Sequence, residues 1–366
     1  MRWATGTVYT AFLATGVGVV LPGAMLPLLL VRWRLSDAQA GILFFLFFLG
    51  STAGAILSRG PLPRSIARGC IAVTAGAVLL AEASRGAAFA AITIYGLGLG
   101  IVMTSVSLLQ SRRYESERAA QMARLNLAWA TGACLGPSLA LRGAAAWGMP
   151  AVLLGMAAFF GLTAGLVLVI VPGADAAPTT SPVMRGSVPA ALLLVLVPLA
   201  TGVESATNGW LATYSKRAGQ TLGEVIGAAT CFWAGMLVSR FLQSHRRIAT
   251  ASAMPLMVCG PWLISAALGV LLLSSGGLSM LAGALLLGLA IGPMYPLLLA
   301  LALRRGEAGN VVFVAAGCGA ALLPLLTGLV SGWTGSLRAG LGVSLAGAVA
   351  MGCLGLAGWQ SVGNRE

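Results

Sequence analysis

The residue best placed to do chemistry in this 366-residue chain is Glu204, an acidic side chain inside a long apolar stretch. It lies ten residues before Tyr214, near the predicted outer end of that stretch. In a helix, this spacing puts the carboxylate roughly 15 Å deep, near the middle of a bilayer. Because a carboxylate is costly at that depth and desolvation favours its protonated form, the position predicts a proton-exchanging group. The alternative is a structural glutamate, hydrogen-bonded to the helix predicted at 309–332 or to backbone carbonyls.

Polar and aromatic side chains near Glu204 could bind a solute. Asn208 follows Glu204 by one turn and Thr201 precedes it by three residues, so the three share one helix face. An amide and a hydroxyl can hydrogen-bond to the hydroxyl groups of a solute, and the ring of Trp210 could cover the apolar face of a sugar. Trp210 lies about 240° round the helix from Glu204, so packing against a neighbouring helix is its alternative role.

Other apolar stretches supply further candidate contacts. Asn126 and Trp129 are three residues apart, and Gln110 belongs to a polar stripe with an alternative place at the cytoplasmic rim. Tyr295 stands between two prolines that should kink its helix and release backbone carbonyls, so it could contact substrate or simply pack. The predicted substrate-binding set is therefore Thr201, Asn208, Trp210, Asn126, Trp129, Gln110, Tyr295 and Trp233.

The composition indicates which elements must position these residues. The chain is 58% apolar and 8% charged, and it contains 50 glycines. A soluble domain carries about 25% charged residues and about 7% glycine, so a soluble enzyme is excluded. Apolar runs of about 20 residues can cross a bilayer as α-helices, in which every backbone group is satisfied internally. The sequence predicts an all-α polytopic membrane protein with twelve transmembrane helices, at 8–31, 37–58, 66–84, 87–111, 119–141, 149–172, 188–214, 222–242, 252–274, 277–303, 309–332 and 337–360.

The longest break between predicted helices is 173–187, rich in Pro, Ala, Thr and Ser. We expect a cytoplasmic linker there between two six-helix halves, 1–172 and 188–366. With the N-terminus inside, 15 Lys and Arg residues fall on the cytoplasmic side and 7 on the other. This bias predicts cytoplasmic termini in a bacterial inner membrane, and it makes the net charge of +13 a marker of topology rather than of a nucleic-acid partner. The arginines predicted at the cytoplasmic gate are Arg59, Arg64, Arg112, Arg113, Arg240 and Arg304.

The two halves resemble each other at a spacing of 192 residues. Gly96 and Gly100 correspond to Gly288 and Gly292, and the paired arginines of the gate repeat at the same spacing. Two halves repeated in the same direction are the plan of a rocker-type secondary transporter. The alternative is that such glycine patterns are merely common in membrane helices.

The sequence lacks the residues that metal binding, ATP-driven transport or catalysis would need. The six cysteines stand singly and the one histidine has no partner at ligand spacing, so we predict no metal site and no cofactor. No GxxxxGK[ST] motif is present, which argues against an ATP-driven pump. A membrane-embedded enzyme or a sensing scaffold would need clustered catalytic side chains at membrane depth.

Two motifs resemble the major facilitator superfamily. The stretch from Gly54 through Ser58-Arg59-Gly60, followed by further arginines, is similar to the family's cytoplasmic gating motif. Ser58 stands where that motif carries an acidic residue, so the inner gate must be held differently here. Gly132-Ala-Cys-Leu-Gly-Pro137 resembles the family's helix 5 element, in which small residues allow close packing and proline bends the helix. The resemblance covers about 8 to 360 and implies two pseudo-symmetric six-helix halves.

Four further stretches resemble the fucose:proton symporter-like branch, which includes glucose/galactose transporters. They are GVESATNGWLATY at 202–214, CFWAGMLVSR at 231–240, GPMYP at 292–296 and GCGAALLP at 317–324. Members of that branch carry acidic residues in helices 1 and 4 for coupling, whereas the corresponding stretches here have none. The resemblance therefore implies a sugar substrate but leaves uniport open beside proton symport.

The sequence as a whole predicts a secondary transporter, not an enzyme, that moves a small polar solute, with a hexose favoured and protons coupled through Glu204. An exporter of amphipathic compounds or drugs on the same fold, or a sugar uniporter, is the alternative. The expected partners are the solute, protons and the lipid bilayer, and a monomer is the expected state.

Overall fold

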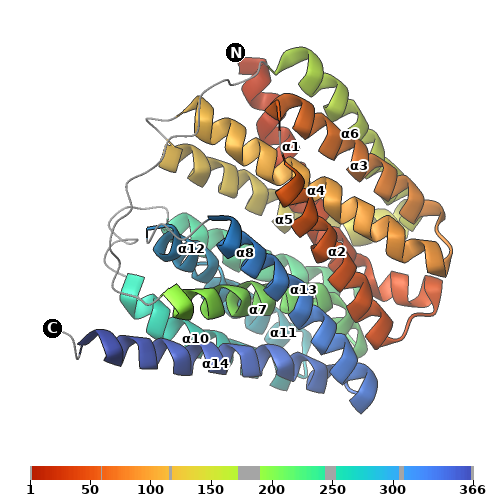
Figure 1. The fold of residues 1–366 in the computed structure, drawn as a ribbon. Coiled ribbons are helices and arrows are strands. Elements are labelled where there is room, and N and C mark those ends of the chain that lie inside the picture. Colours follow the sequence, from red (N-terminus) through yellow and green to blue (C-terminus); the bar gives the residue numbers. More distant parts are fainter. Residues whose placement is uncertain are drawn as a thin grey trace. The chain divides into compact units, whose positions relative to one another are not determined.

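The structure is a computed structural model that describes residues 2–58, 60–114, 118–171, 190–243, 253–304 and 309–363. Within these ranges the regular structure is entirely α-helical (Figure 1). The helices are α1 (Arg2–Trp33), α2 (Asp37–Leu57), α3 (Leu62–Glu82), α4 (Arg85–Arg113), α5 (Arg118–Trp147), α6 (Met149–Ile170), α7 (Ala190–Arg217), α8 (Leu222–Gln243), α10 (Ala253–Leu273), α11 (Gly277–Ile291), α12 (Met294–Arg304), α13 (Gly309–Thr334) and α14 (Leu337–Gly363).

This set confirms the twelve-helix prediction. Helices α11 and α12 are two parts of one predicted span, and together they form an apolar segment from Gly277 to Ala302. Among the described residues, eleven segments are long and apolar enough to cross a membrane, and α5 falls outside that group. Three arginines among the many alanines and glycines of α5 lower its hydropathy. The sequence-predicted kink near Tyr295 is a true break, with residues 292 and 293 in a turn.

The described helices form two compact units. Unit 1 comprises residues 1–35 and 46–179, and unit 2 comprises residues 36–45 and 180–366. The linker predicted at 173–187 lies outside the described residues, so the domain limits stay a prediction. The sequence did not predict that the first turns of α2 would group with unit 2.

An ion pair and an aromatic contact hold the start of α2 within unit 2. Arg217, at the end of α7, donates to both carboxylate oxygens of Asp37 at 2.6 Å. Ser331 of α13 donates to the same carboxylate. About two turns further along α2, the Phe44 ring lies edge-on to Trp210 of α7, with centroids 5.8 Å apart. Polar and apolar contacts therefore fix the same end of α2.

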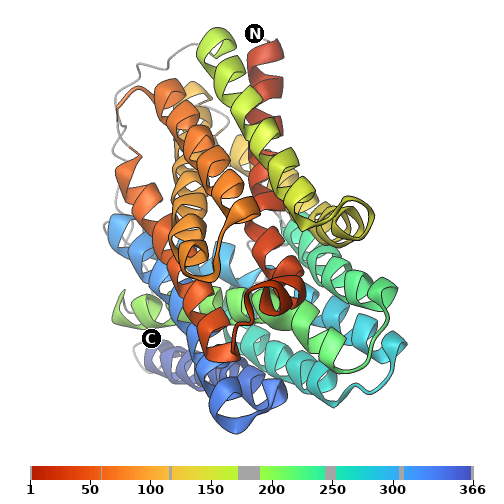
Figure 2. The same cartoon turned by 90° about the vertical axis from the view of Figure 1, so that its right-hand side faces the viewer.

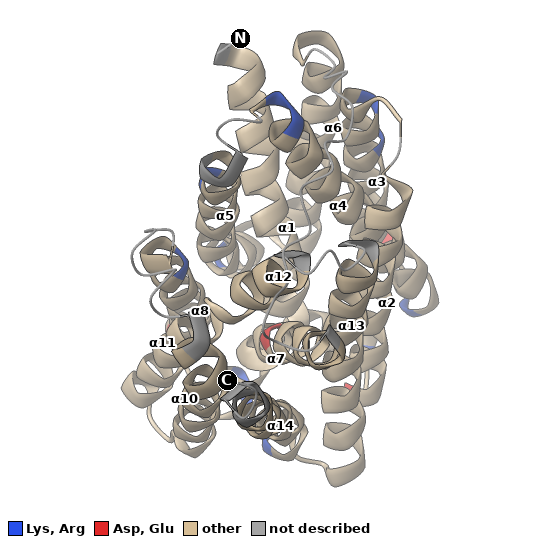
Figure 3. Cartoon of the chain, turned by 60° about the vertical axis from the view of Figure 1, so that its left-hand side comes forward, with Lys and Arg blue, Asp and Glu red and all other residues tan. Residues whose placement is uncertain are grey.

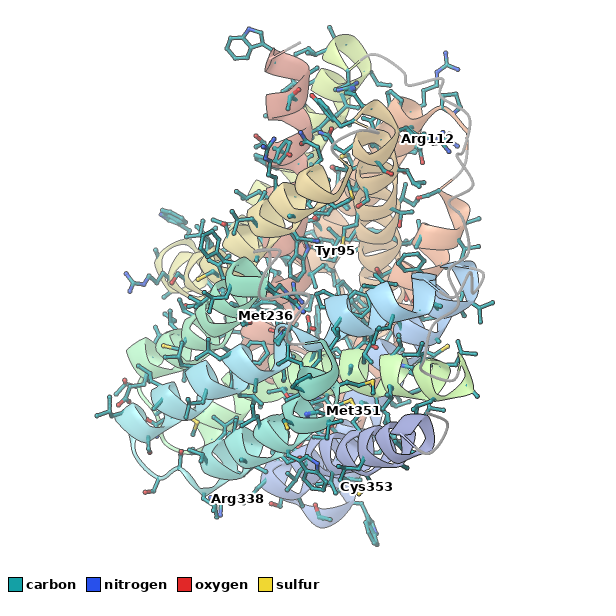
Figure 4. All side chains as sticks on the ribbon, turned by 90° about the vertical axis from the view of Figure 1, so that its left-hand side faces the viewer. Tyr95, Arg112, Met236, Arg338, Met351 and Cys353 are labelled. Atoms are coloured by element: carbon teal, nitrogen blue, oxygen red, sulfur yellow. The ribbon has the colours of Figure 1, made fainter. Side chains whose placement is uncertain are left out.

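Close helix contacts in unit 1 depend on small residues of α4. A Cβ on Gly96 would collide with the carbonyl of Phe47, and one on Gly100 would collide with that of Ser51. Both carbonyls belong to α2, so glycine allows the two backbones to touch. On another face of α4, Tyr95 is fully buried and donates to the carbonyl of Gly18 in α1. Figure 4 labels Tyr95, and Figure 2 shows α1 and α6 side by side in the same unit, in red and yellow-green.

Unit 2 repeats this packing at the positions that the sequence repeat identifies. A Cβ on Gly288 of α11 would collide with the carbonyl of Phe232 in α8, and one on Gly292 would meet the hydroxyl of Ser239. Gly96 and Gly100 thus face α2, and Gly288 and Gly292 face α8. The 192-residue repeat is therefore a repeat of a helix–helix contact, not only of composition.

Replacing Gly288 tests this contact. We expect Gly288→Ala to lower the unfolding temperature in detergent, because the methyl group must push α8 and α11 apart at a cost of about 1–3 kcal/mol. The matched control is Gly269→Ala in α10, where a Cβ has open space. That control should be neutral or stabilising, since alanine favours helix by up to about 1 kcal/mol. Equal effects of the two substitutions would contradict the assigned contact.

Candidate functional site

The centre of the candidate site is an ion pair between Glu204 of α7 and Arg240 of α8. The guanidinium Nη2 of Arg240 donates to both carboxylate oxygens of Glu204, at 3.4 Å each. The side chains are 17% and 15% exposed, respectively, so both charges are largely removed from solvent. At this depth each charge needs a partner of opposite sign, which the pair supplies. Figure 3 shows how sparse charged residues are on the helices, with one acidic segment on α7.

Arg240 also reaches the break between α11 and α12. Its Nε donates to the carbonyl of Gly292 at 3.3 Å, and the amide of Gln243, one turn later, donates to the carbonyl of Pro293 at 3.2 Å. The sequence predicted that prolines would release carbonyls here, and the structure shows which side chains of α8 take them. Arg240 thereby contacts both a carboxylate and a helix break.

Three of the predicted substrate contacts gather around this pair. Asn208, one turn beyond Glu204, accepts a hydrogen bond at 2.9 Å from the indole of Trp233. Tyr295, in the first turn of α12, lies close enough to Glu204 and Arg240 to be within range of both charges. We call these five residues, Glu204, Asn208, Trp233, Arg240 and Tyr295, the α7–α8–α12 cluster. It combines a charge pair, an amide, a phenol and an indole within unit 2.

Two other predicted contacts hold α7 against α13. Thr201 donates to the carbonyl of Ala316 at 2.8 Å, and the indole of the fully buried Trp210 donates to the carbonyl of Pro324 at 3.1 Å. Between them, Ser205 donates to the carbonyl of Ala320 at 3.0 Å. The three bonds rise along two parallel helices at nearly constant spacing, so they form a ladder. Trp210 thus adopts the packing role named as its alternative, and the structure does not place it in the α7–α8–α12 cluster.

The predicted contacts of the first half occupy different environments in unit 1. Asn126 on α5 is exposed, and Trp129 one turn later is 8% exposed. Gln110 on α4 is fully buried, and neither atom of its amide has a hydrogen-bond partner. A buried, unsatisfied amide is costly, so a solute or a second conformation could satisfy it. Their role in binding stays a prediction.

Serine hydroxyls replace the acidic residue of the gating motif. Ser58, at the end of α2, donates to the carbonyl of Ile101 in α4. The hydroxyl of Ser105 lies 3.2 Å from that of Ser58 and 2.8 Å from that of Ser65 on α3. Neutral hydrogen bonds therefore join α2, α3 and α4 where a carboxylate was expected from the family motif. This arrangement differs from the carboxylate of the family motif, as the presence of Ser58 led us to expect.

The predicted gate arginines are only partly described. Arg64 is exposed, and Arg112 and Arg113 are half-buried at the end of α4. Arg59 and the side chain of Arg304 lie outside the described residues. Arg240 differs from the others because it reaches Glu204, a partner that sequence reasoning missed. The sequence feature that could have pointed to this partner is the position of Arg240 on the same predicted helix as Trp233, nine residues after Cys231.

The described residues contain no group of three or more His, Cys, Asp or Glu side chains that could hold a metal ion. The α7–α8–α12 cluster offers hydrogen-bond donors and acceptors to a polar group, and it includes a carboxyl group, a side chain that can bind or release a proton. A bundle of long apolar helices, one of them broken beside a largely buried ion pair, is typical of multi-pass membrane transporters.

Comparison with known proteins identifies the family. The sequence model of the Major Facilitator Superfamily matches residues 8–311. The chain belongs to this superfamily of transporters, whose members are not enzymes. No curated protein matches the chain by sequence.

Solved structures agree on the fold. The chain is similar to a bacterial homolog of the human lysosomal transporter Spinster in an inward-facing, unoccupied conformation, with a TM-score of 0.77. The two sequences are 12% identical, and the match covers 99% of this chain and 97% of that one. The occupied form of that homolog matches with a TM-score of 0.73 at 12% identity, over 97% of this chain and 96% of that one.

A double-mutant cycle tests the Glu204–Arg240 pair. We expect Glu204→Gln and Arg240→Gln each to lower the thermal stability in detergent, since leaving one buried charge unpaired costs about 3 kcal/mol. The double variant should lose less than the sum, because no unpaired charge remains, with a coupling of about 1 kcal/mol or more. Arg338→Gln is the control, since Arg338 is exposed at the start of α14 (Figure 4). Strictly additive losses would show that the two side chains do not interact.

Proposed function

We propose that this chain is a secondary transporter that moves a hexose together with protons by alternating access, with Glu204 as the proton-coupling residue. The observation that carries the proposal is the Glu204–Arg240 ion pair, largely removed from solvent beside a broken helix. A carboxylate in that position is costly unless it changes its charge during the cycle or keeps its partner throughout.

The geometry of the pair favours a changing charge. Both contacts of Arg240 with Glu204 are 3.4 Å long, whereas Arg217 meets Asp37 at 2.6 Å in the same unit. Arg240 is also engaged by the carbonyl of Gly292. Because a long, shared contact is weaker than a short bidentate one, it opposes protonation of Glu204 less. Glu204 can then exchange a proton when the surroundings of Arg240 change.

The neighbours of the pair support a polyhydroxylated solute. Asn208 offers an amide and Tyr295 a phenol, groups that commonly bind sugar hydroxyls, and the buried indole of Trp233 supports Asn208 from behind. Trp233 and Asn208 are hydrogen-bonded to each other, which orients both before a solute arrives. The motif resemblance to the fucose:proton symporter-like branch points to the same class of solute.

The distribution of Lys and Arg along the chain indicates its orientation in the membrane. We propose a bacterial inner-membrane location with both termini in the cytoplasm, based on the 15-to-7 distribution of Lys and Arg. The half-buried arginines at the end of α4 then lie on the cytoplasmic side with the linker. We also propose a monomer as the transporting unit.

Transport in proteoliposomes tests the coupling. We expect purified protein to take up a labelled hexose faster when the outside is acidic relative to the inside. Glu204→Gln should abolish the response to the pH gradient, because glutamine cannot exchange a proton. The matched control is Glu82→Gln, an exposed carboxylate at the end of α3, which should keep the response.

The alternatives give different results in the same assays. Hexose uptake that ignores the pH gradient in the wild type would contradict proton coupling and support a uniporter. A thermal-shift panel separates the solute classes: stabilisation by hexoses supports the proposal. Stabilisation by lipophilic cations or amphiphiles without any hexose effect would replace it with export of amphipathic compounds.

A further inference from the structure

Three side chains near the end of α8 contact the break between α11 and α12. The hydroxyl of Ser239 occupies the space that a Cβ of Gly292 would need. Arg240 donates to the carbonyl of Gly292, and Gln243 donates to the carbonyl of Pro293. Helix α8 therefore recognises the broken backbone through one close contact and two hydrogen bonds. Met236, one turn before Arg240 and labelled in Figure 4, is fully buried.

The sequence explains why these carbonyls need partners. In an unbroken helix the carbonyl of Gly292 would accept from the N–H of residue 296, but that residue is proline and has no N–H. A backbone carbonyl removed from water without a partner is costly, so Arg240 supplies the missing donor. The carbonyl of Pro293 also accepts from the N–H of Leu297, which starts the hydrogen bonding of α12.

One guanidinium therefore joins two different elements. Arg240 contacts Glu204 of α7 through Nη2 and the start of α12 through Nε. We propose that Arg240 is a positioning residue that transmits the charge state of Glu204 to the break, so that α12 is the element released when Glu204 takes up a proton. This inference rests on the proposed proton exchange at Glu204, and it adds the part of the protein that responds.

The physical reason is that the Arg240 guanidinium is held by the charge of Glu204 on one side and by the Gly292 carbonyl on the other. While Glu204 is ionised, the charge-assisted contact holds Arg240 between α7 and the break. When Glu204 is neutral, the attraction falls and the guanidinium can leave the Gly292 carbonyl. The start of α12 then loses a hydrogen bond that its own proline prevents it from replacing. The half-helix should open more often as a result.

The surroundings of Glu204 contain few other groups that could produce the same response. Among the described residues, those that interact with its carboxylate are Arg240 and Tyr295. The described part of α11 carries no titratable side chain. The titratable groups on the other helices packed against α7 are Glu224 and Cys231 on α8, Cys318 on α13, and Arg338 and Cys353 on α14. Asp37 of α2 pairs with Arg217 at the end of α7, and the side chain of Arg304 on α12 lies outside the described residues.

These other groups are set apart from the carboxylate. Glu224 bonds to Thr221 at the opposite end of α8 from Arg240, and Cys231 lies nine residues before Arg240. Cys318, Arg338 and Cys353 are exposed. On α7 itself, Tyr214 donates to the carbonyl of Leu272, and Lys216 and Arg217 lie at the helix end. A pH response of α12 should therefore depend on Glu204.

Hydrogen exchange on the full-length protein in detergent tests the inference without any solute. Amide protection of a peptide covering α12 is measured by mass spectrometry at pH 5.5 and pH 8, corrected for the intrinsic pH dependence of exchange. In the wild type we expect protection of α12 to fall about tenfold at the lower pH, the size expected for loss of one charge-assisted hydrogen bond. Protection of α6 in unit 1 should not change.

Variants then assign the response. Glu204→Gln should show low protection of α12 at both pH values, because its side chain is always neutral. Arg240→Lys keeps a positive charge for Glu204 but removes the Nε donor to Gly292, so it too should lose the pH response. Arg338→Gln, at an exposed position, should behave as the wild type. These variants retain the size of the original side chains, which favours folding.

Two results would overturn the inference: protection of α12 that does not depend on pH in the wild type, or a pH response that survives in Glu204→Gln. The proposed function is tested independently of this inference, by hexose uptake in proteoliposomes. A pH response of α12 in a protein whose hexose uptake ignores the pH gradient would support the role of Arg240 and contradict symport. Proton-coupled uptake with an α12 that does not respond to pH would support symport and contradict the role of Arg240.

Discussion

The unit that carries the α7–α8–α12 cluster depends on the need to neutralise a carboxylate inside apolar helices. Glu204 is stable there because Arg240 brings an opposite charge to within 3.4 Å. The same arginine lies at the end of α8 that contacts the break in α11–α12. The break is in turn tolerated because Arg240 and Gln243 supply donors to its carbonyls. Charge neutralisation and backbone satisfaction are thus met by the same few side chains.

Apart from the Arg217–Asp37 pair, the other described helix contacts rely on backbone groups and small residues rather than on charge. In each unit, glycines allow two helices to approach until a Cβ could not fit, and on α7 a ladder of hydroxyl and indole donors reaches the carbonyls of α13. Lipid gives apolar side chains no reason to prefer one another over the bilayer, so close packing and hydrogen bonds specify the partners. At the gating motif, too, neutral hydroxyls of Ser58, Ser65 and Ser105 form the contacts, where the family motif carries an acidic residue.

Much of the fold was predictable because membrane solvent restricts the choices. The twelve helices followed from the length of the apolar runs, although several ends differ by a few residues, as in α1, which begins at Arg2 rather than at 8. The two prolines predicted a kink near Tyr295, where the structure has a break. The repeat of Gly96 and Gly288 was visible as a spacing, and the structure gave it a meaning as a helix contact. The roles of the predicted site residues stay predictions, although the structure shows where their side chains lie. Glu204, Asn208, Trp233 and Tyr295 gather in one cluster, whereas Thr201 and Trp210 are engaged in packing α7 on α13.

By itself, then, the sequence determined the solvent, the helical class, the number of helices and the one carboxylate placed deep within them, because each follows from composition and spacing along the chain. Only the tertiary structure decided that Arg240 is the partner of that carboxylate and that the start of α2 belongs to unit 2 through Asp37 and Arg217. Those pairings join residues 36 and 180 positions apart. No periodicity along a single helix encodes them, since they depend on how separate helices turn and pack.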